Sequence, residues 1–347
     1  GVAGIAKDDG TVGAYGFPHW NWNKDPKNIP SFLKGEIPLM RFEAGGGYHT
    51  ARSITCHNHK VYSVTRDTFY VKNEKGERIL EKGLLGLFTK DQEDKAKRII
   101  NQDSLKVGVV PTLSKGLLLY LYLKHTGDNS PEKQAESPAE GYLFYSPSED
   151  LNKPEDFNKF KLIPDIVPTG APIPIDHRKL IVPCGKNLEM LVLSKNGYSQ
   201  SEQWFMPPLE REILALSALE ELALCTDSLR GYTLIDLKQM KSFPSLKNGK
   251  SFKRQNLPSE ATSCALTMYD SKEYALFGAD GGKLLVYGVV KDGNQPSLEY
   301  INTVTFLSLE GIRDVGKENN IHGIKVDNHN YVHFAMRNFY LRIGMPR

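Results

Sequence analysis

The stretch KVYSVTRDTFYVKN (residues 60–73) places two β-prone apolar runs on either side of the polar pair Arg66-Asp67. Valine, tyrosine, threonine and phenylalanine favour strands, and aspartate tolerates the backbone conformations of a tight bend. The stretch therefore predicts a β-hairpin. Six more stretches have the same form, one of them split by a polar insert: residues 2–16, 117–124 with 141–146, 180–193, 222–235, 274–287 and 331–343.

The hairpins recur at a spacing that indicates a repeat architecture. Their first residues lie roughly 40 to 63 positions apart, and a unit recurring at such a spacing is typical of propellers and arrays. Short runs with small side chains precede the hairpins, as in ARSITC (residues 51–56) and TSCALTM (residues 262–268). Small side chains suit an innermost strand, where strands crowd around an axis, so each unit is predicted to have four strands.

This pattern predicts an all-β fold, a β-propeller whose single domain spans residues 1–347. Each blade is expected to bury its apolar faces on its neighbours, and closure of the ring removes exposed sheet edges. We expect seven blades, with strands from the N- and C-termini closing the ring, because no inner strand precedes the first hairpin. Six blades with an appended hairpin are the alternative.

One segment conflicts with the repeat. PLEREILALSALEELAL (residues 208–224) is rich in strong helix formers, and its apolar residues recur at helical spacing. In the repeat, the same segment supplies an inner strand, a turn at residues 219–221 and the start of a hairpin. We favour the strands.

Two insertions interrupt the repeat. TKDQ (residues 89–92) is a capping-box pattern that predicts a short surface helix near residues 89–101. Residues 124–140 (KHTGDNSPEKQAESPAE) have no apolar face and are expected to form a flexible loop. In a propeller, the hairpin bends and the loops that lead into the inner strands share one side, which we call the bend face. The second insertion is expected to overhang this face.

The composition limits the class of protein. A formal charge of +3 on 347 residues gives no electrostatic footprint for DNA or an anionic membrane. No apolar run approaches the roughly 18 residues of a membrane span. No signal peptide is visible, although Gly1 is not an initiator methionine and a removed export signal stays open. Four cysteines are expected to be reduced core thiols, with a disulfide between neighbouring strands as the alternative: Cys56, Cys184, Cys225 and Cys264.

The bend face is where we expect a ligand. Polar side chains around the central pit of a propeller commonly bind ligands. The alternative is that the same side chains are ordinary turn residues. The candidates that the repeat places there are Tyr48, His49, Arg66, Asp67, Arg230, Asp280, Asn320, His322, Arg337 and Asn338.

Two further motifs have the composition of small-ligand sites. GGG (residues 45–47) lacks the strand and helix context of a phosphate-binding loop and indicates a plain loop. His57 and His59 lie at strand spacing and could share one face, with His49 as a third metal ligand. We instead expect a solvated turn there, and no metal or cofactor.

Two others have the composition of polymer-binding sites. Trp20 and Trp22 lie in a polar loop, where they either stack on a sugar and anchor a partner or are buried beneath the loop. KSFPSLKNGKSFKR (residues 241–254) carries five basic residues with two phenylalanines between them. It either grips phosphate or an acidic polymer, or forms a solvated outer strand and turn.

Several stretches resemble repeats of known propeller families. Residues 319–343 (NNIHGIKVDNHNYVHFAMRNFYLRI) are similar to NHL-type and bacterial neuraminidase-like repeats, and residues 274–287 (YALFGADGGKLLVY) resemble a degenerate WD repeat without its Trp-Asp pair. Residues 145–160 and 193–205 lie where sialidase-like propellers carry an Asp box, and keep its serine and later aromatic residue. The resemblance implies a β-propeller without pointing to one family. A sialidase-type arginine cluster would correspond to Arg41, Arg52 and Arg66.

The sequence indicates a propeller scaffold but contains no recognisable catalytic motif. We therefore favour a binding platform whose bend face holds a protein or peptide partner. The chain is expected to be a monomer, and its charge argues against a nucleic-acid ligand. The alternative is a secreted carbohydrate-active enzyme, a glycoside hydrolase or polysaccharide lyase that acts on a glycan in the central pit. Its catalytic candidates are His49, Arg66, His322, Arg337 and Tyr48.

Overall fold

The computed structural model divides into two compact units, each described here by itself. Unit 1 comprises Gly1–Thr169 with Ser194–Ser199, and unit 2 comprises Gly170–Leu193 with Gln200–Arg347. The described residues are 2–6, 11–16, 40–43, 51–65, 67–73, 77–102, 104–123, 140–201, 208–227, 229–237, 254–291, 296–305, 321–326, 331–336 and 340–344. Only the backbone is described for residues 2–6, 11–16, 40–43, 51–52, 65, 305, 322, 335–336 and 340–344.

Seven antiparallel sheets form the described part of the chain, and each takes its strands in chain order. The first three sheets have three, four and four strands. They are β1 (Val2–Ala6), β2 (Thr11–Gly16) and β3 (Met40–Glu43); β4 (Ala51–His57), β5 (Lys60–Thr65), β6 (Thr68–Asn73) and β7 (Arg78–Gly83); and β8 (Leu105–Pro111), β9 (Leu117–Leu123), β10 (Gly141–Ser146) and β11 (Lys161–Leu162).

The next four sheets have four, four, four and three strands. They are β12 (Ile173–Pro174), β13 (Lys179–Cys184), β14 (Asn187–Ser194) and β15 (Gly197–Gln200); β16 (Ala215–Leu219), β17 (Leu222–Thr226), β18 (Gly231–Asp236) and β19 (Gln255–Asn256); β20 (Ala261–Tyr269), β21 (Lys272–Ala279), β22 (Lys283–Val290) and β23 (Ser297–Thr305); and β24 (Ile321–Val326), β25 (Tyr331–Met336) and β26 (Tyr340–Gly344).

All seven predicted hairpins are confirmed as antiparallel pairs. The one split by an insertion is also present, because β9 and β10 pair along their whole length on either side of it. In six of the seven, a short inner strand precedes the hairpin, as the small-residue runs predict. The pairs are β1–β2, β5–β6, β9–β10, β13–β14, β17–β18, β21–β22 and β25–β26.

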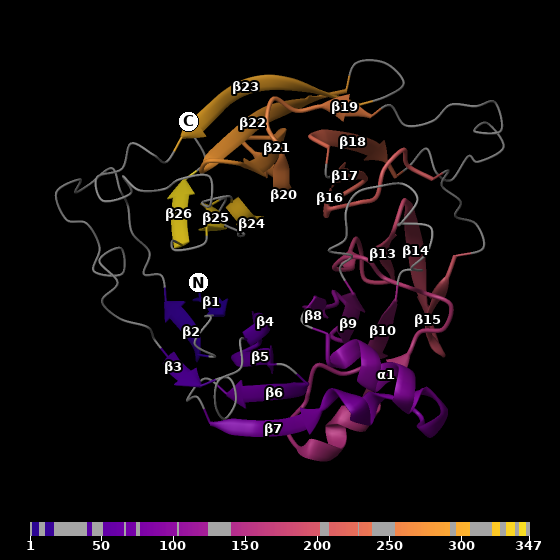
Figure 1. Cartoon of the computed structure of the whole chain (residues 1–347). Helices are drawn as coiled ribbons and strands as arrows, with labels where there is room; N and C mark the ends of the chain where they lie inside the picture. Colours follow the sequence, from indigo (N-terminus) through magenta and orange to yellow (C-terminus); the bar gives the residue numbers. More distant parts are fainter. Residues whose placement is uncertain are drawn as a thin grey trace. The chain divides into compact units, whose positions relative to one another are not determined.

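The inner strands lie beside one another within each unit, so that sheet follows sheet as in Figure 1: β4 beside β8, β16 beside β20 and β20 beside β24. Short hydroxyl side chains link them. Thr55 Oγ1 donates to the carbonyl of Val109 at 2.8 Å, and the Leu266 amide donates to Ser217 Oγ at 2.8 Å. Small residues on these strands therefore allow close approach and supply hydrogen bonds between sheets.

The first hairpin does not occupy the predicted position in its sheet. Its first strand, β1, lies beside the inner strand β4, as the inner strands of successive sheets do elsewhere in each unit. The first hairpin thus begins with an inner strand. The described strands at the two ends form separate three-stranded sheets, and closure of the ring by terminal strands stays a prediction.

The helix-like segment 208–224 folds as strands. It contains β16 and the start of β17, which pair from Ala215↔Thr226 to Leu219↔Leu222. Glu220 occupies the intervening turn with a φ of 50°. Every residue of β17 is buried, so burial in the repeat outweighs a helix propensity worth a few tenths of a kcal/mol per residue.

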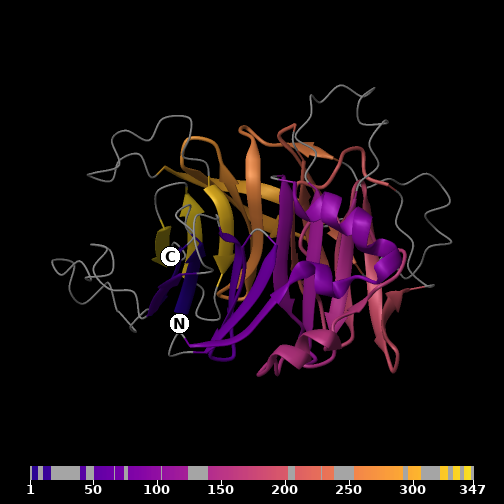
Figure 2. The same cartoon turned by 60° about the horizontal axis from the view of Figure 1, so that its bottom comes forward.

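A short helix lies where the capping-box pattern predicts one. The turn η3 (Lys90–Gln92) leads into α1 (Glu93–Ile100), and the Thr89 amide donates to Gln92 Oε1 at 3.4 Å. Ala96, Ile99 and Ile100 face the core, and Figure 2 shows α1 alongside the upright strands of unit 1. None of the described helices, which also include η2 (Leu84–Leu87) and η4 (Pro154–Lys159), is both long and apolar enough to cross a membrane. Residues 124–139 lie outside the described part of the chain.

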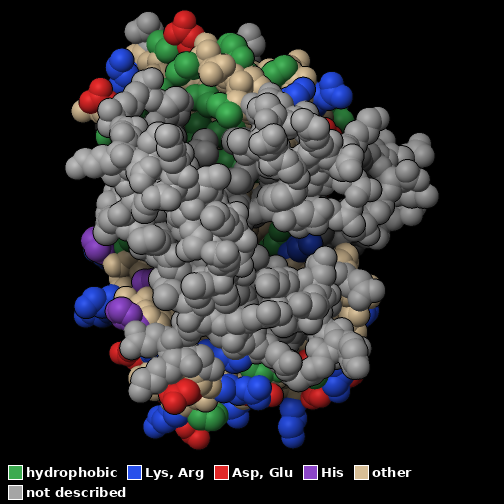
Figure 3. All heavy atoms as spheres, turned by 90° about the vertical axis from the view of Figure 1, so that its left-hand side faces the viewer, with side chains coloured by type: hydrophobic (Ala, Val, Ile, Leu, Met, Phe, Trp, Pro, Cys, Tyr) green, Lys and Arg blue, Asp and Glu red, His purple; other side chains and the backbone are tan. Residues whose placement is uncertain are grey.

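The core of unit 1 runs from β4–β7 to β8–β11 and includes α1. The Phe69 ring lies 5.6 Å from that of Phe157 in η4. The outer strand β7 is exposed and charged, with Arg78 over the ring of Tyr70 and paired with Glu81. At the bottom of Figure 3, basic and acidic side chains are interspersed on the surface. The strand β7 lies at the bottom of Figure 1. Such charges protect an edge strand from pairing with another chain.

The cysteines are free thiols, as predicted. Cys225 and Cys264 are buried, while Cys56 and Cys184 are half-buried. Burial raises the pKa of Cys264 to about 12 and that of Cys56 to about 11. The Cys56 and Cys264 thiols are therefore protonated near neutral pH in the folded chain.

Candidate functional site

The bend face of unit 2 is assembled by backbone hydrogen bonds. The amides of Leu209 and Ile213, in the loop that leads into β16, donate to the β13–β14 bend at 2.8 and 3.0 Å. The loop ahead of β20 meets two further bends, since Leu257 donates to Arg230 and Asp280 donates to Glu260. Bends and lead-in loops therefore share one side of this unit, as the repeat predicts.

An ion pair lies at the β17–β18 bend of this face. Arg254 Nε donates to Asp227 Oδ2 at 2.6 Å, and Arg254 Nη2 donates to Asp227 Oδ1 at 3.0 Å. The remaining contacts of the guanidinium go to the Leu229 carbonyl at 2.8 Å and Asn256 Oδ1 at 2.7 Å. This bidentate pair joins the β17–β18 bend to the segment that enters β19.

The bend is shaped around the Asp227 carboxylate. Its Oδ1 accepts from the amides of Leu229 and Gly231 at 2.8 and 3.0 Å. Burial would raise the pKa of Asp227, but the hydrogen bonds from Arg254 and these two amides outweigh it, so the pKa lies below its ordinary value. A side chain at Gly231 would collide with Asp227 Oδ2 and the Arg254 guanidinium. Glycine is therefore required here by space.

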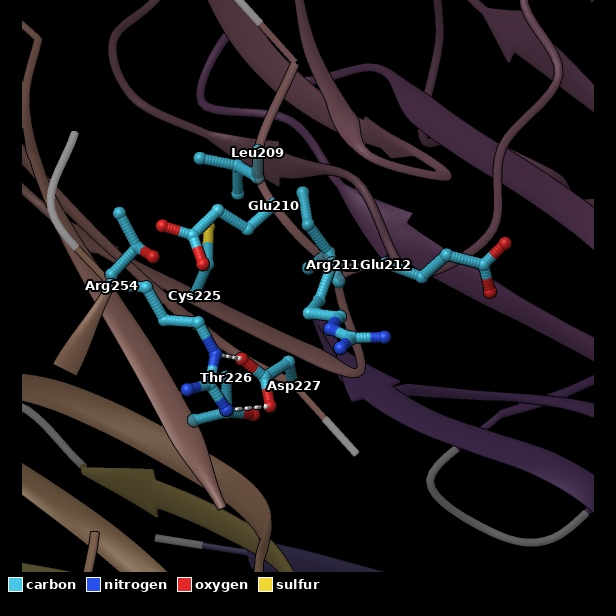
Figure 4. Close-up of a pocket in the computed structure, with 10 residues that line it drawn as sticks. Leu209, Glu210, Arg211, Glu212, Cys225, Thr226, Asp227 and Arg254 are labelled. Atoms are coloured by element: carbon cyan, nitrogen blue, oxygen red, sulfur yellow. Dashed lines mark hydrogen bonds and ion pairs between the residues drawn. The ribbon is translucent and has the colours of Figure 1, made fainter. Parts of the chain in front are cut away.

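A small recess lies between this ion pair and the loop 209–213 (Figure 4). Its volume is about 220 Å³ including its open mouth, which is below the range of most small-molecule sites. In Figure 4, Glu210 points toward Arg254 and Arg211 extends to the side of Asp227, whereas the Glu212 carboxylate points away. Thr226 also lines the recess, and its buried Oγ1 has no hydrogen-bond partner among the described residues.

The structure places three of the ten predicted bend-face residues in bends. Asp67 is exposed at the β5–β6 bend of unit 1, where its carbonyl accepts from Leu84 at 2.6 Å. Arg230 is exposed with a φ of 59°, and Asp280 is half-buried. Arg230 and Asp280 both contact the segment 257–260, so unit 2 brings them to one loop.

The other predicted residues are not described in full. The His322 backbone is the unpaired residue of a β-bulge in β24. The remaining six, Tyr48, His49, Arg66, Asn320, Arg337 and Asn338, lie outside the described residues. The catalytic set of the enzyme alternative therefore stays a prediction.

The histidine motif does not form a shared face. His57 ends β4, and His59 lies in the turn that follows with a φ of 57°. His57 Nε2 lies 2.8 Å from Glu149 Oε2, and Asn58 Nδ2 donates to Glu149 Oε1 at 2.5 Å. Among the described residues, no three His, Cys, Asp or Glu side chains are grouped to hold a metal ion. This cluster fastens the loop after β10 to a tight turn.

Three other motifs fall largely outside the description. Trp20, Trp22 and residues 45–47 are not described, and of the basic segment 241–254 only Arg254 is. The sequence analysis considered Arg254 only as part of a basic segment and did not predict its ion pair with Asp227. The Asp227–Gly231 spacing is a legible sign of an aspartate bend, but nothing in the sequence shows that its partner lies 27 residues further on.

Comparison with known proteins identifies the fold without identifying a family. No family model matches the chain, and no curated protein matches its sequence. Solved structures do match over nearly the whole chain. The Pan2 WD40 domain of Neurospora crassa has a TM-score of 0.51 at 10% identity, covering 99% of this chain and 88% of that one.

Two further propellers match at similar levels. BBS1N, solved in complex with ARL6DN, has a TM-score of 0.56 at 11% identity, covering 100% of this chain and 87% of that one. The Dos1 propeller has a TM-score of 0.54 at 9% identity, covering 96% and 72%. At such low identity the likeness concerns the fold alone. Seven successive antiparallel sheets and these neighbours together show that the chain has the all-β fold of a β-propeller.

Proposed function

We propose that this protein is a binding platform that holds a protein or peptide partner on its bend face. The observation that carries the proposal is the construction of that face in unit 2. Backbone hydrogen bonds and the Asp227–Arg254 pair fix the bends, while Leu229 (48% exposed) and Arg230 project from them. A rigid surface with exposed apolar and arginine side chains is the usual composition of a protein-binding site.

One solved neighbour agrees with this use of the fold. BBS1N was solved in complex with ARL6DN, so a propeller of this kind does bind another protein.

The proposal is tested with paired charge reversals at exposed positions of unit 2. Arg230→Asp alters the bend face, and aspartate tolerates the left-handed backbone there. Lys272→Asp makes the same charge change at the opposite end of the strands, beside the β20–β21 turn. We expect immobilised wild type and Lys272→Asp to retain the same partner from native extract, and Arg230→Asp to lose it. Equal retention by all three would contradict the proposal.

A further inference from the structure

The outer strand of one sheet in unit 2 has an open edge. The strand β23 has nine residues and lies at the end of the order β20–β21–β22–β23, so its only partner in the sheet is β22. Figure 1 shows it on the outside of that sheet. Alternate amides and carbonyls of such a strand point away from the sheet. Among the backbone hydrogen bonds described outside the sheets, none involves β23.

The other outer strands of the four-stranded sheets are short or charged. The strands β11 and β19 have two residues each, and β15 has four. The strand β7 has six residues, and three of them are charged. Short or charged outer strands deter pairing with another chain, whereas β23 (SLEYINTVT) has one charged residue, Glu299. Among the described sheets of four strands, β23 therefore has the least protected edge.

A β-bulge gives this edge an apolar side chain on each face. The pairing of β22 with β23 shifts after Tyr300 and leaves Ile301 as the extra residue. The rings of Tyr300 and Tyr287 lie 5.5 Å apart, whereas Ile301 lies over Gly288, 3.4 Å from the position that a Cβ would take there. Neighbouring residues of β22 point to opposite faces, so Tyr300 and Ile301 do too. They are 54% and 51% exposed, and an added strand would cover both.

The bulge also limits the length of the edge. It interrupts the regular ladder at Ile301, and beyond it the Thr303 amide already donates to Asn302 Oδ1 at 2.8 Å. The regular stretch before the bulge comprises residues 297–300. A short extended segment fits this stretch, whereas a long flat strand does not.

Charge distinguishes the possible occupants. Glu299 is exposed and pairs with Gly288, so it shares a face with Ile301. In this sheet, the described ion pair joins Glu273 to Lys291, and Glu299 takes no part in it. Because β23 has no basic residue, a second copy of the strand would leave Glu299 without a counter-ion. A strand with a lysine directly opposite supplies one.

We propose that β23 receives an extended segment of a partner protein as a fifth strand of the sheet, along residues 297–301. In antiparallel order, two neighbouring apolar residues of that segment cover Ile301 and Tyr300, and the lysine after them meets Glu299. Main-chain hydrogen bonds provide the attachment, and these side chains select the segment. The inference goes beyond the proposed function, because this surface is the edge of a sheet and not the bend face.

Strand addition is tested by titrating the whole protein with a blocked octapeptide, Lys-Thr-Val-Val-Lys-Thr-Val-Thr. Isothermal calorimetry measures the affinity, and amide hydrogen exchange should slow in the segment that contains β23. The same peptide with N-methyl groups on its Val-Val-Lys amides lacks the central donors of both strand edges. This methylated peptide should not bind.

Three variants locate the site. Ile301→Lys places a charge on the edge and should weaken binding about fivefold or more, since cross-strand contacts are of this size. Leu229→Lys makes the same change at an exposed leucine of the bend face and should leave the affinity unchanged. Glu299→Lys should weaken the lysine peptide and strengthen a version with glutamate after the two valines. A general hydrophobic contact would not exchange its preference in this way.

Several outcomes would overturn the proposal. They are no binding at millimolar peptide, equal binding of the methylated peptide, equal weakening by Ile301→Lys and Leu229→Lys, and an unchanged charge preference in Glu299→Lys. A dimer in sedimentation velocity that Ile301→Lys abolishes, without peptide binding, would assign the edge to a second copy instead. Arg230→Asp should bind the peptide as the wild type does, so failure of strand addition and failure of the bend-face platform are distinguishable.

Discussion

At the scale of single residues, Gly231 determines whether the bend face of unit 2 can form. A Cβ at this position would collide with Asp227 Oδ2 and with the Arg254 guanidinium, both of which are held by further bonds. We expect Gly231→Ala to lower the free energy of unfolding by about 1–3 kcal/mol, as overpacking does elsewhere. Urea unfolding followed by circular dichroism measures this loss.

The control for this substitution is Gly323→Ala in β24. A Cβ there would meet no atom within 4 Å, so its midpoint should stay near that of the wild type. A Gly231→Ala variant as stable as Gly323→Ala would show that the ion pair can move aside.

The Asp227–Arg254 pair should also make stability depend on pH. Because the pKa of Asp227 is lowered in the folded chain, its stabilisation is present above the ordinary aspartate pKa of about 3.9 and is lost as pH falls through the folded value. We expect Asp227→Asn to cost about 2 kcal/mol at pH 7. The difference between variant and wild type, measured by urea unfolding, should shrink below about pH 4. A difference that is constant from pH 7 to pH 3 would exclude the charged pair as its cause.

At this scale, the sequence predicted which residues lie at bends better than it predicted which side chains contact one another. It placed Arg230 and Asp280 at bends because the alternation of strands and turn residues is local. It missed the Asp227–Arg254 pair and the unpaired Thr226, since both depend on which segments the tertiary fold brings together. The same limit explains His57 and His59, whose strand spacing conceals a left-handed turn.

At the scale of elements, hydroxyl side chains on inner strands bond to the next sheet. Ser263 Oγ and Thr262 Oγ1 both donate to the carbonyl of Ile321, at 2.6 and 2.9 Å. We expect Ser263→Ala to cost about 1 kcal/mol, because Thr262 still satisfies the carbonyl. The double variant Thr262→Val, Ser263→Ala should cost more than the sum of the single changes, since the carbonyl then loses both donors. Strict additivity in urea unfolding would show that the two bonds act independently.

The turn between β16 and β17 is strained by its residue. Glu220 adopts a φ of 50°, which costs a residue with a Cβ roughly 1 kcal/mol and costs asparagine less. We expect Glu220→Asn to raise the melting temperature and Glu220→Val to lower it. Scanning calorimetry of the two variants measures the effect. A stabilised Glu220→Val would mean that the turn does not limit this hairpin.

That turn also shows why element prediction succeeded where local propensity was misleading. Taken alone, residues 208–224 have helical spacing, but a helix would leave the hairpin β17–β18 without its inner strand. The recurrence of the repeat outweighed the propensity of one segment. The repeat could not predict how the ring closes, because each terminal sheet occurs only once in the sequence and no other copy of the pattern supports its assignment. The structure places β1 beside the inner strand β4, whereas we expected the first hairpin to lack an inner strand.

At the scale of the whole molecule, the single domain predicted from the repeat makes a claim about cooperativity. Blades that bury their apolar faces on one another cannot unfold separately without exposing those faces. The native cysteines report on both units, since Cys56 lies in unit 1 and Cys225 and Cys264 lie in unit 2.

We expect all three thiols to become reactive at the same urea concentration when a thiol reagent is pulsed and the labelled peptides are identified by mass spectrometry. Gly231→Ala lies in unit 2, and in a single cooperative domain it should lower the labelling midpoint of Cys56 as much as that of Cys225. Gly323→Ala should shift neither thiol. If Gly231→Ala moves only Cys225 and Cys264, the two units unfold independently. The prediction of one domain would then fail, although the seven hairpins would remain.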